Sequence, residues 1–112
     1  MFDLSNHTAV VIGGTSGIGL TLAKGLAQAG ANVVATGRRT NLAESAARDI
    51  RKLGRHSLVA TTDVTNRQSI EDLLRVCLAE FSSVEILLNC AGGTAKRTRM
   101  GREWDTSTGG LT

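Results

Sequence analysis

The segment VVIGGTSGIGLTLAKGLAQAGANVVATGRR, residues 10–39, joins an apolar run to a glycine-rich turn and then to a helical pattern. The turn contains Gly13, Gly14, Gly17 and Gly19. Glycine costs conformational entropy in ordered structure, so this density indicates a sharp bend or the close approach of another group. A phosphate is the group we expect, because free N–H groups and the helix dipole favour an anion at a helix start.

Two kinds of phosphate-binding loop compete for this turn, and a plain strand-to-helix turn is the alternative to both. Residues 14–21 have the spacing of the P-loop GxxxxGK[ST], but Leu20 stands at the lysine position. That lysine reaches the β- and γ-phosphates of a nucleoside triphosphate, so its replacement argues against an ATPase or GTPase. The dinucleotide fingerprint GxGxxG also fails literally, since the spacing is Gly13-x-x-x-Gly17-x-Gly19. Its context is present: a strand before, a helix after, and a charged residue about 20 positions further on.

The size of the chain and its apolar stretches limit the class of protein. The chain has 112 residues, which is enough for one domain with one core. No apolar stretch approaches the roughly 20 residues of a membrane span, and no signal peptide is visible. Cys77 and Cys90 lack CxxC spacing and suggest neither a disulfide framework nor a metal site. We therefore expect a cytoplasmic protein without a membrane partner.

The formal net charge is +3, and the densest basic group lies in residues 96–102. The only aromatic residues are Phe2, Phe81 and Trp104, so aromatic side chains do not alternate with the basic ones. A solvated loop is favoured over a nucleic-acid contact for this group, and no nucleic-acid partner is expected.

Four apolar runs read as strands, at residues 8–12, 32–36, 57–61 and 84–89. The first, second and fourth are nearly continuous, as expected of strands that are buried on both faces of a parallel sheet. Three helical patterns lie between the four runs. Their apolar stripes are Ile18, Leu22, Leu26 and Ala29 in the first, Leu42, Ala46, Ile50 and Leu53 in the second, and Ile70, Leu73, Leu74, Cys77 and Phe81 in the third.

Helix boundaries follow from glycines and capping residues. The first helix is expected to begin at Gly17, and Gly30 and Gly54 are expected to end the first and second helices. Asn41 with Glu44, and Thr65 with Gln68, have the spacing of a capping box at the starts of the second and third helices.

Alternating strands and helices imply an α/β fold with parallel strands and right-handed crossovers. We expect one domain over residues 1–112, a Rossmann-like doubly wound sheet truncated to about four strands in the order 3-2-1-4. Ligands of such sheets bind beyond the carboxyl ends of the strands, where the strand order reverses. The glycine turn and the sequence NCAGG at 89–93 both lie there. The strand at 84–89 is expected to be a sheet edge without a neighbour.

Three motifs resemble those of the short-chain dehydrogenases/reductases in order and spacing. They are GGTSGIG at 13–19, DV at 63–64 and NCAG at 89–92, against the family's TGxxxGxG, an acidic residue before an apolar one, and NNAG. Ile12 replaces the usual threonine, and Cys90 replaces the second asparagine. The resemblance covers residues 1–95, and we expect residues 96–112 to be irregular.

The resemblance implies a nicotinamide dinucleotide cofactor and a role for each matching residue. The turn over the pyrophosphate would consist of Gly13, Ser16, Gly17, Ile18 and Gly19. Asp63 would accept a hydrogen bond from the adenine amino group, and the Val64 backbone would meet the ring. The residues against the ribose and nicotinamide would be Asn89, Ala91 and Gly92. Taken alone, Asp63 is equally a common turn residue before a helix.

Arg38 and Arg39 bear on the choice between NAD and NADP. A carboxylate at the end of the second strand would accept hydrogen bonds from the ribose hydroxyls and repel a 2′-phosphate. The planar fork of arginine instead matches a phosphate. The pair favours NADP over NAD, and solvated charges at a helix entry are the alternative.

Catalysis in the family depends on a Ser-Tyr-Lys set with YxxxK spacing, and this sequence contains no tyrosine. We therefore assign no catalytic residue, expect the 112-residue chain alone to be inactive, and expect it to be a truncated copy or an incomplete reading of a longer protein.

The leading hypothesis is the cofactor-binding part of an NADP-preferring oxidoreductase that interconverts a secondary alcohol and a ketone. Residues 2–14 are most similar to family members acting on sugar acids or 3-oxoacyl thioesters, and the longer parent is expected to be a homo-oligomer. The alternatives are a non-catalytic dinucleotide-binding or regulatory module, and a nucleic-acid-binding domain that uses the basic tail.

Overall fold

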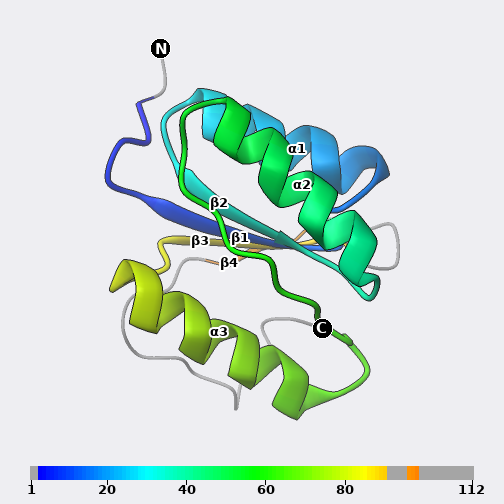
Figure 1. Cartoon of the computed structure of the whole chain (residues 1–112). Helices are drawn as coiled ribbons and strands as arrows, with labels where there is room; N and C mark the ends of the chain where they lie inside the picture. Colours follow the sequence, from blue (N-terminus) through cyan, green and yellow to red (C-terminus); the bar gives the residue numbers. More distant parts are fainter. Residues whose placement is uncertain (1–2, 91–95, 99–112) are drawn as a thin grey trace.

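The strand β1 (Thr8–Ile12) is the centre of a sheet whose strand order is β2-β1-β3-β4. The computed structural model describes residues 3–90 and 96–98. Its further elements, in chain order, are α1 (Gly17–Gln28), β2 (Asn32–Thr36), α2 (Thr40–Lys52), α3 (Arg67–Phe81), β3 (Ile86–Asn89) and β4 (Lys96–Thr98). Figure 1 shows α1 and α2 on one face of the sheet and α3 on the other. The α/β class and the parallel pairing of β2, β1 and β3 are confirmed.

The sheet is buried on both faces, as the continuous apolar runs predict. Alternate residues of β1 face opposite sides, because successive side chains of a strand point in opposite directions. Val11 and Val33 pack with Ala23 and Ile50 from the α1–α2 layer, and a second cluster places β-strand residues against α3. The members of that second cluster are Val10, Ile12, Val34, Leu87 and Val84, with Ile70, Leu73, Leu74 and Cys77 of the helix.

The segment 57–61, predicted as a strand, lies beside β2 without forming a regular ladder. Among the described residues it forms one bridge, the parallel pair Gly37–Thr61, and Ala60 O accepts a hydrogen bond from the Thr36 side chain at 2.7 Å. The Thr36 hydroxyl thus adds a side-chain bond at the carboxyl end of the segment, where the bridge lies. The four predicted segments therefore lie in the expected order, which is 57–61, 32–36, 8–12 and 84–89. The segment 57–61 is not a regular strand.

The edge next to β3 differs from the sequence-based expectation. β3 begins at Ile86 rather than Val84, because the Glu85 carboxylate accepts the Thr8 N–H at 2.7 Å in place of a strand carbonyl. Lys96–Thr98, expected to be irregular, form an antiparallel strand on β3. The expectation that this strand would lack a neighbour is wrong.

α1 begins at Gly17 as predicted, but of its predicted stripe only Leu26 is placed against the core cluster, and the fully buried residues are others. Ile18 is 72% exposed and Leu22 is 36% exposed, whereas Gly19, Ala23 and Ala27 face the sheet. Small residues at this spacing bring the helix backbone close to the strands, which leucine or isoleucine would prevent. The helix ends at Gln28 with Ala29 as C-cap, and Gly30, the predicted terminating glycine, follows with a φ of +112°.

α2 begins at Thr40, with Arg39 as its N-cap, so the capping box assigned to Asn41 and Glu44 is wrong. Ala43 N donates to Arg39 O at 3.1 Å and closes the first turn earlier than expected. The buried residues are Ala43, Ala46, Ala47 and Ile50, while Leu53 is 38% exposed after the last turn. Gly54 ends the helix as predicted, with φ +82°.

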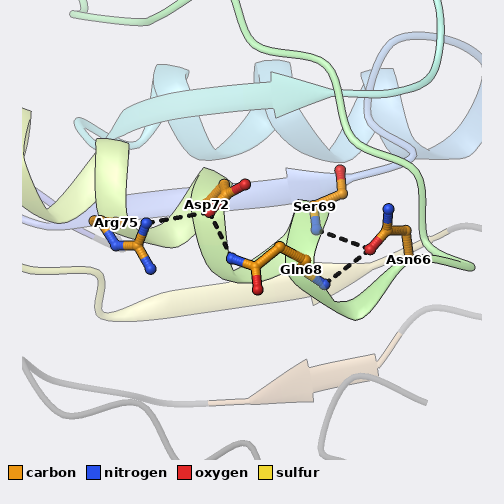
Figure 2. A network of polar contacts seen from close by, with 5 residues as sticks. All are labelled: Asn66, Gln68, Ser69, Asp72 and Arg75. Atoms are coloured by element: carbon orange, nitrogen blue, oxygen red, sulfur yellow. Dashed lines mark hydrogen bonds and ion pairs between the residues drawn. The ribbon is translucent and has the colours of Figure 1, made fainter.

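α3 is capped by Asn66 rather than Thr65, so its capping box is also wrong. The Asn66 side chain accepts from Gln68 N at 3.0 Å and from Ser69 N at 3.4 Å, as Figure 2 shows. The predicted apolar face is confirmed, and burial raises the pKa of the Cys77 thiol to about 12. No helix in the described part of the chain has the length and apolar character needed to cross a membrane.

Candidate functional site

A hollow of about 430 Å³ lies at the carboxyl ends of β1 and β2. It brings together three stretches that are distant in sequence: the glycine turn, the loop after β2, and the loop that enters α3. Its lining residues are Ile12, Gly13, Thr15, Ser16, Gly37, Arg38, Arg39, Leu42, Thr62 and Val64. Five of the residues singled out from sequence are among them: Gly13, Ser16, Arg38, Arg39 and Val64. Gly17, Ile18, Gly19, Asp63 and Asn89 do not line it.

The glycine turn is held tightly against β1 and β2. Gly13 N and Gly14 N both donate to Thr36 O of β2, at 2.8 and 3.1 Å. A Cβ on Gly14 would stand 2.7 Å from Val11 O, and one on Gly19 would stand 2.0 Å from Gly13 O. These two glycines are therefore required by close backbone packing.

Gly17 is required for a different reason. Its φ is +57°, in the left-handed region that side chains rarely adopt, and nothing lies within 4 Å of the place of a Cβ. Ser16 precedes it as N-cap in an extended conformation and makes no side-chain capping bond. The first backbone N–H groups of α1 therefore have no side-chain cap from Ser16, and N–H groups at a helix start favour an anion.

The loop after β2 places two exposed cations at the start of α2. Gly37 is packed under the glycine turn, where a Cβ would come 2.8 Å from Thr15 Oγ1. Arg38 and Arg39 follow it, and both line the hollow. Arg39 is also the N-cap of α2, so the positive end of that helix dipole adds to the two guanidinium charges. This side of the hollow attracts anions.

Asp63 is held as a carboxylate by the loop that enters α3. Thr65 Oγ1 and Thr65 N donate to Asp63 Oδ1 at 2.6 and 3.0 Å. The Thr65 hydroxyl lowers the pKa of Asp63 most, the Thr65 amide adds to this, and the charge of Arg38 lowers it further. Asp63 is thus the turn residue that local chemistry predicts, and it remains an ionised hydrogen-bond acceptor near Arg38.

The end of β3 lies next to the end of β1. Asn89 pairs in register with Ile12, and Cys90 N donates to Ile12 O at 2.7 Å. Burial raises the pKa of the Cys90 thiol, which leaves it protonated and weakly nucleophilic. Ala91 and Gly92 lie outside the described residues.

Thr15, Gly37, Leu42 and Thr62 also line the hollow and were not singled out from sequence. Thr15, Gly37 and Thr62 each stand directly beside a predicted site residue, so adjacency to the motifs is the signal that could have found them. Leu42 belongs to the predicted apolar stripe of α2 and gave no such signal.

The opposite end of the sheet carries another hollow, of about 650 Å³, lined by Asn32 and His56 among others. Although it is larger, none of the predicted site residues lines it, and it faces the amino end of β2. Among residues 3–90 and 96–98, no group of three or more His, Cys, Asp or Glu side chains is placed to hold a metal ion.

Comparisons with known proteins agree on one family. The family model described as short chain dehydrogenase matches residues 7–107. The chain is 39% identical over 92 residues to gluconate 5-dehydrogenase of Gluconobacter oxydans, covering 82% of this chain and 36% of that protein. It is 38% identical over 91 residues to D-beta-hydroxybutyrate dehydrogenase of Cupriavidus necator, covering 80% of this chain and 34% of that protein.

Solved structures are similar as well. A hydroxysteroid dehydrogenase from Escherichia coli superposes with a TM-score of 0.75 at 29% identity, over 78% of this chain and 37% of that one. A short-chain type dehydrogenase/reductase from Mycobacterium marinum gives 0.73 at 30% identity, over 77% of this chain and 34% of that one. The chain spans about a third of the length of these relatives. It belongs to the short-chain dehydrogenase family of oxidoreductases.

Proposed function

We propose that this chain forms the dinucleotide-binding part of an oxidoreductase that interconverts a secondary alcohol and a ketone and prefers NADP over NAD. The observation that carries the proposal is the 430 Å³ hollow, which joins the glycine turn to Arg38 and Arg39 at the carboxyl end of the parallel strands. Doubly wound sheets bind dinucleotides at this place.

The residues present fit a pyrophosphate at the start of α1. Gly17 has room where a Cβ would stand, and Gly19 allows the helix to approach the Gly13 carbonyl. The unpaired N–H groups of the first helical turn would donate to phosphate oxygens, and the helix dipole would favour their charge. Gly13, Ser16 and Ile18 complete this turn in the proposal.

The preference for NADP rests on charge. Arg38 and Arg39 line the hollow, and the positive end of the α2 dipole lies at Arg39. A guanidinium forms paired, charge-assisted hydrogen bonds with a phosphate, so these residues would hold a 2′-phosphate. An adenosine ribose without that phosphate would leave both charges without an anion.

The remaining parts of the cofactor are assigned by position. Asp63, kept ionised by Thr65, would accept from the adenine amino group, and the Val64 backbone would meet the ring. The end of β3, with Asn89 and the following Ala91 and Gly92, would lie against the ribose and nicotinamide. When bound, the cofactor would carry the hydride, and the residues of this chain would bind and orient it.

The names of the relatives support the proposed class of substrate. Gluconate 5-dehydrogenase, D-beta-hydroxybutyrate dehydrogenase and hydroxysteroid dehydrogenase are all named for hydroxyl compounds. A secondary alcohol that is oxidised to a ketone is the class that these names share.

Calorimetric titration of the full chain with NADPH and NADH tests the proposal. We expect NADPH to bind more tightly, and adenosine 2′,5′-bisphosphate to bind more tightly than adenosine 5′-monophosphate. The second pair isolates the 2′-phosphate from the nicotinamide. Equal affinity within both pairs would contradict the NADP preference, and absence of binding by all four ligands from a folded chain would contradict dinucleotide binding itself.

A further inference from the structure

Two buried threonine hydroxyls lie behind the hollow and connect its walls. Thr36, the last residue of β2, is 0% exposed, and Thr62 is 3% exposed. Their Oγ1 atoms lie 2.9 Å apart. The Thr36 carbonyl also accepts from Gly13 N and Gly14 N, so the same residue holds the glycine turn from the other side.

The hydroxyl hydrogens have a determined direction. Thr36 Oγ1 lies 2.7 Å from Ala60 O, and a carbonyl oxygen can only accept, so Thr36 donates its single hydrogen there. Thr62 must then donate its own hydrogen to Thr36 Oγ1. The result is an ordered chain from Thr62 through Thr36 to Ala60, with every hydroxyl hydrogen used.

Backbone pairing alone holds this part of the sheet weakly. Besides the single Gly37–Thr61 bridge, Val33 N donates to His56 O at 3.1 Å at the amino end, and Thr62 N donates to Gly37 O at 2.8 Å at the carboxyl end. The carboxyl end is the one beside the hollow. Because a regular ladder is missing along residues 57–61, side-chain bonds carry part of the task of fixing this end.

We infer that Thr36 and Thr62 are positioning residues for the adenosine half of the cofactor site. Their hydroxyl chain holds the wall that contains Thr62 and Val64 at a set distance from the wall that contains Arg38 and Arg39. The inference rests on the proposed function, since the distance matters only if one ligand contacts both walls. The hydroxyl chain also fixes the loop that contains Thr62, and this effect does not depend on any ligand.

Isosteric substitutions test the inference. Thr36→Val and Thr62→Val keep the shape of the side chain and remove the hydroxyl, whereas Thr36→Ser and Thr62→Ser keep the hydroxyl. We expect the valine variants to bind NADPH about five- to tenfold more weakly, from the loss of a buried hydrogen bond, and the serine variants to bind nearly as the wild type does. Thr8→Val is the matched control, because Thr8 is a buried threonine at the amino end of β1.

Amide hydrogen exchange supplies a readout without ligand. In both valine variants the backbone amide of residue 62 should be less protected from exchange than in the wild type, while the Val33 amide at the other end of the segment should keep its protection. Faster exchange at both amides would indicate general loss of stability and would overturn the positioning role.

The remaining outcomes are also separable. Wild-type NADPH affinity in both folded valine variants, or equal weakening by Thr8→Val, would overturn the inference. If the wild-type chain binds no NADPH, the proposed function fails by itself. Unchanged protection of the residue 62 amide in the valine variants would then show that the hydroxyl chain does not fix the loop either.

Discussion

Gly17 combines a left-handed φ of +57° with open space where a side chain would stand. The backbone conformation needs glycine, and the open space is where a pyrophosphate would approach the helix. A residue with a side chain would therefore incur backbone strain of about 1–2 kcal/mol and also obstruct the ligand.

We expect Gly17→Val to abolish NADPH binding in calorimetry, after circular dichroism has shown that the variant is folded. Gly17→Asn separates the two causes, because asparagine tolerates the left-handed region but still occupies the space. Gly25→Val in the same helix is the control, since a side chain there meets nothing within 4 Å. Normal NADPH binding by folded Gly17→Asn would mean that this glycine serves the turn alone.

Arg38 is the residue on which cofactor choice depends in the proposal. Arg38→Asp replaces a phosphate partner by a carboxylate that accepts from ribose hydroxyls and repels a 2′-phosphate. We expect NADPH affinity to fall by about 1.5–3 kcal/mol, and NADH to be favoured relative to it. Titration with both cofactors measures this, and Arg48→Asp, an exposed arginine of α2 that does not line the hollow, controls for net charge. Equal losses in the two variants would refute a specific role for Arg38.

At the scale of elements, the stripe of small residues on α1, Gly19, Ala23 and Ala27, determines how closely the helix packs against the sheet. A Cβ on Gly19 would stand 2.0 Å from Gly13 O, a distance that requires backbone movement. We expect Gly19→Ala to lower the free energy of unfolding by about 1–3 kcal/mol, as overpacking does. Gly25→Ala, in open space within the same helix, should instead be stabilising by about 0.5–1 kcal/mol. Denaturant unfolding of both variants checks the difference, and equal stability would contradict the close packing.

The start of α3 depends on Asn66, whose side chain accepts two backbone N–H groups (Figure 2). We expect Asn66→Ala to cost about 1 kcal/mol in thermal or denaturant unfolding, because the first turn loses its cap. Asn66→Asp keeps the acceptor and adds a charge that the helix dipole favours, so it should retain the stability. If Asn66→Ala were as stable as the wild type, another residue would be capping this helix.

At the scale of the whole molecule, the described residues would bind and orient the cofactor in the proposal, but no histidine, cysteine or carboxylate is among those that line the hollow. His7 and His56 lie at the amino ends of β1 and of the segment 57–61, away from the hollow. Burial raises the pKa of Cys90, so its thiol remains protonated near neutral pH. A positioned acid or base contributes about 100- to 10,000-fold to such reactions.

We therefore expect the 112-residue chain to show no steady turnover of NADPH with a panel of ketones, measured at the nicotinamide absorbance. Cofactor binding in the same preparation shows that the chain is competent. Steady turnover that Cys90→Ser abolishes would overturn this expectation, because it would place the chemistry within the chain.

Local patterns were enough to predict much of the fold. The bounds of β1 and β2, the start of α1 at Gly17 and the buried face of α3 follow from apolar periodicity and from glycine, which act over a few neighbouring residues. Gly13, Ser16, Arg38 and Arg39 were likewise singled out from sequence and line the hollow, since their choice depended on residue type and position relative to a strand; their role in binding stays a prediction.

Contacts between elements decided the rest. The buried face of α1 is set by the close fit of Gly19 against the Gly13 carbonyl after β1. The segment 57–61 is tied to β2 by the Gly37–Thr61 bridge and by the bond from the Thr36 hydroxyl to Ala60 O. Residue periodicity predicts neither, because these contacts form only when the elements have come together. The place of Thr62 in the wall of the hollow has the same origin. The sequence by itself determined which loops meet at the carboxyl end of the sheet. The tertiary structure decided which side chains hold these loops together, because hydrogen bonds form only between groups that folding has already brought within reach.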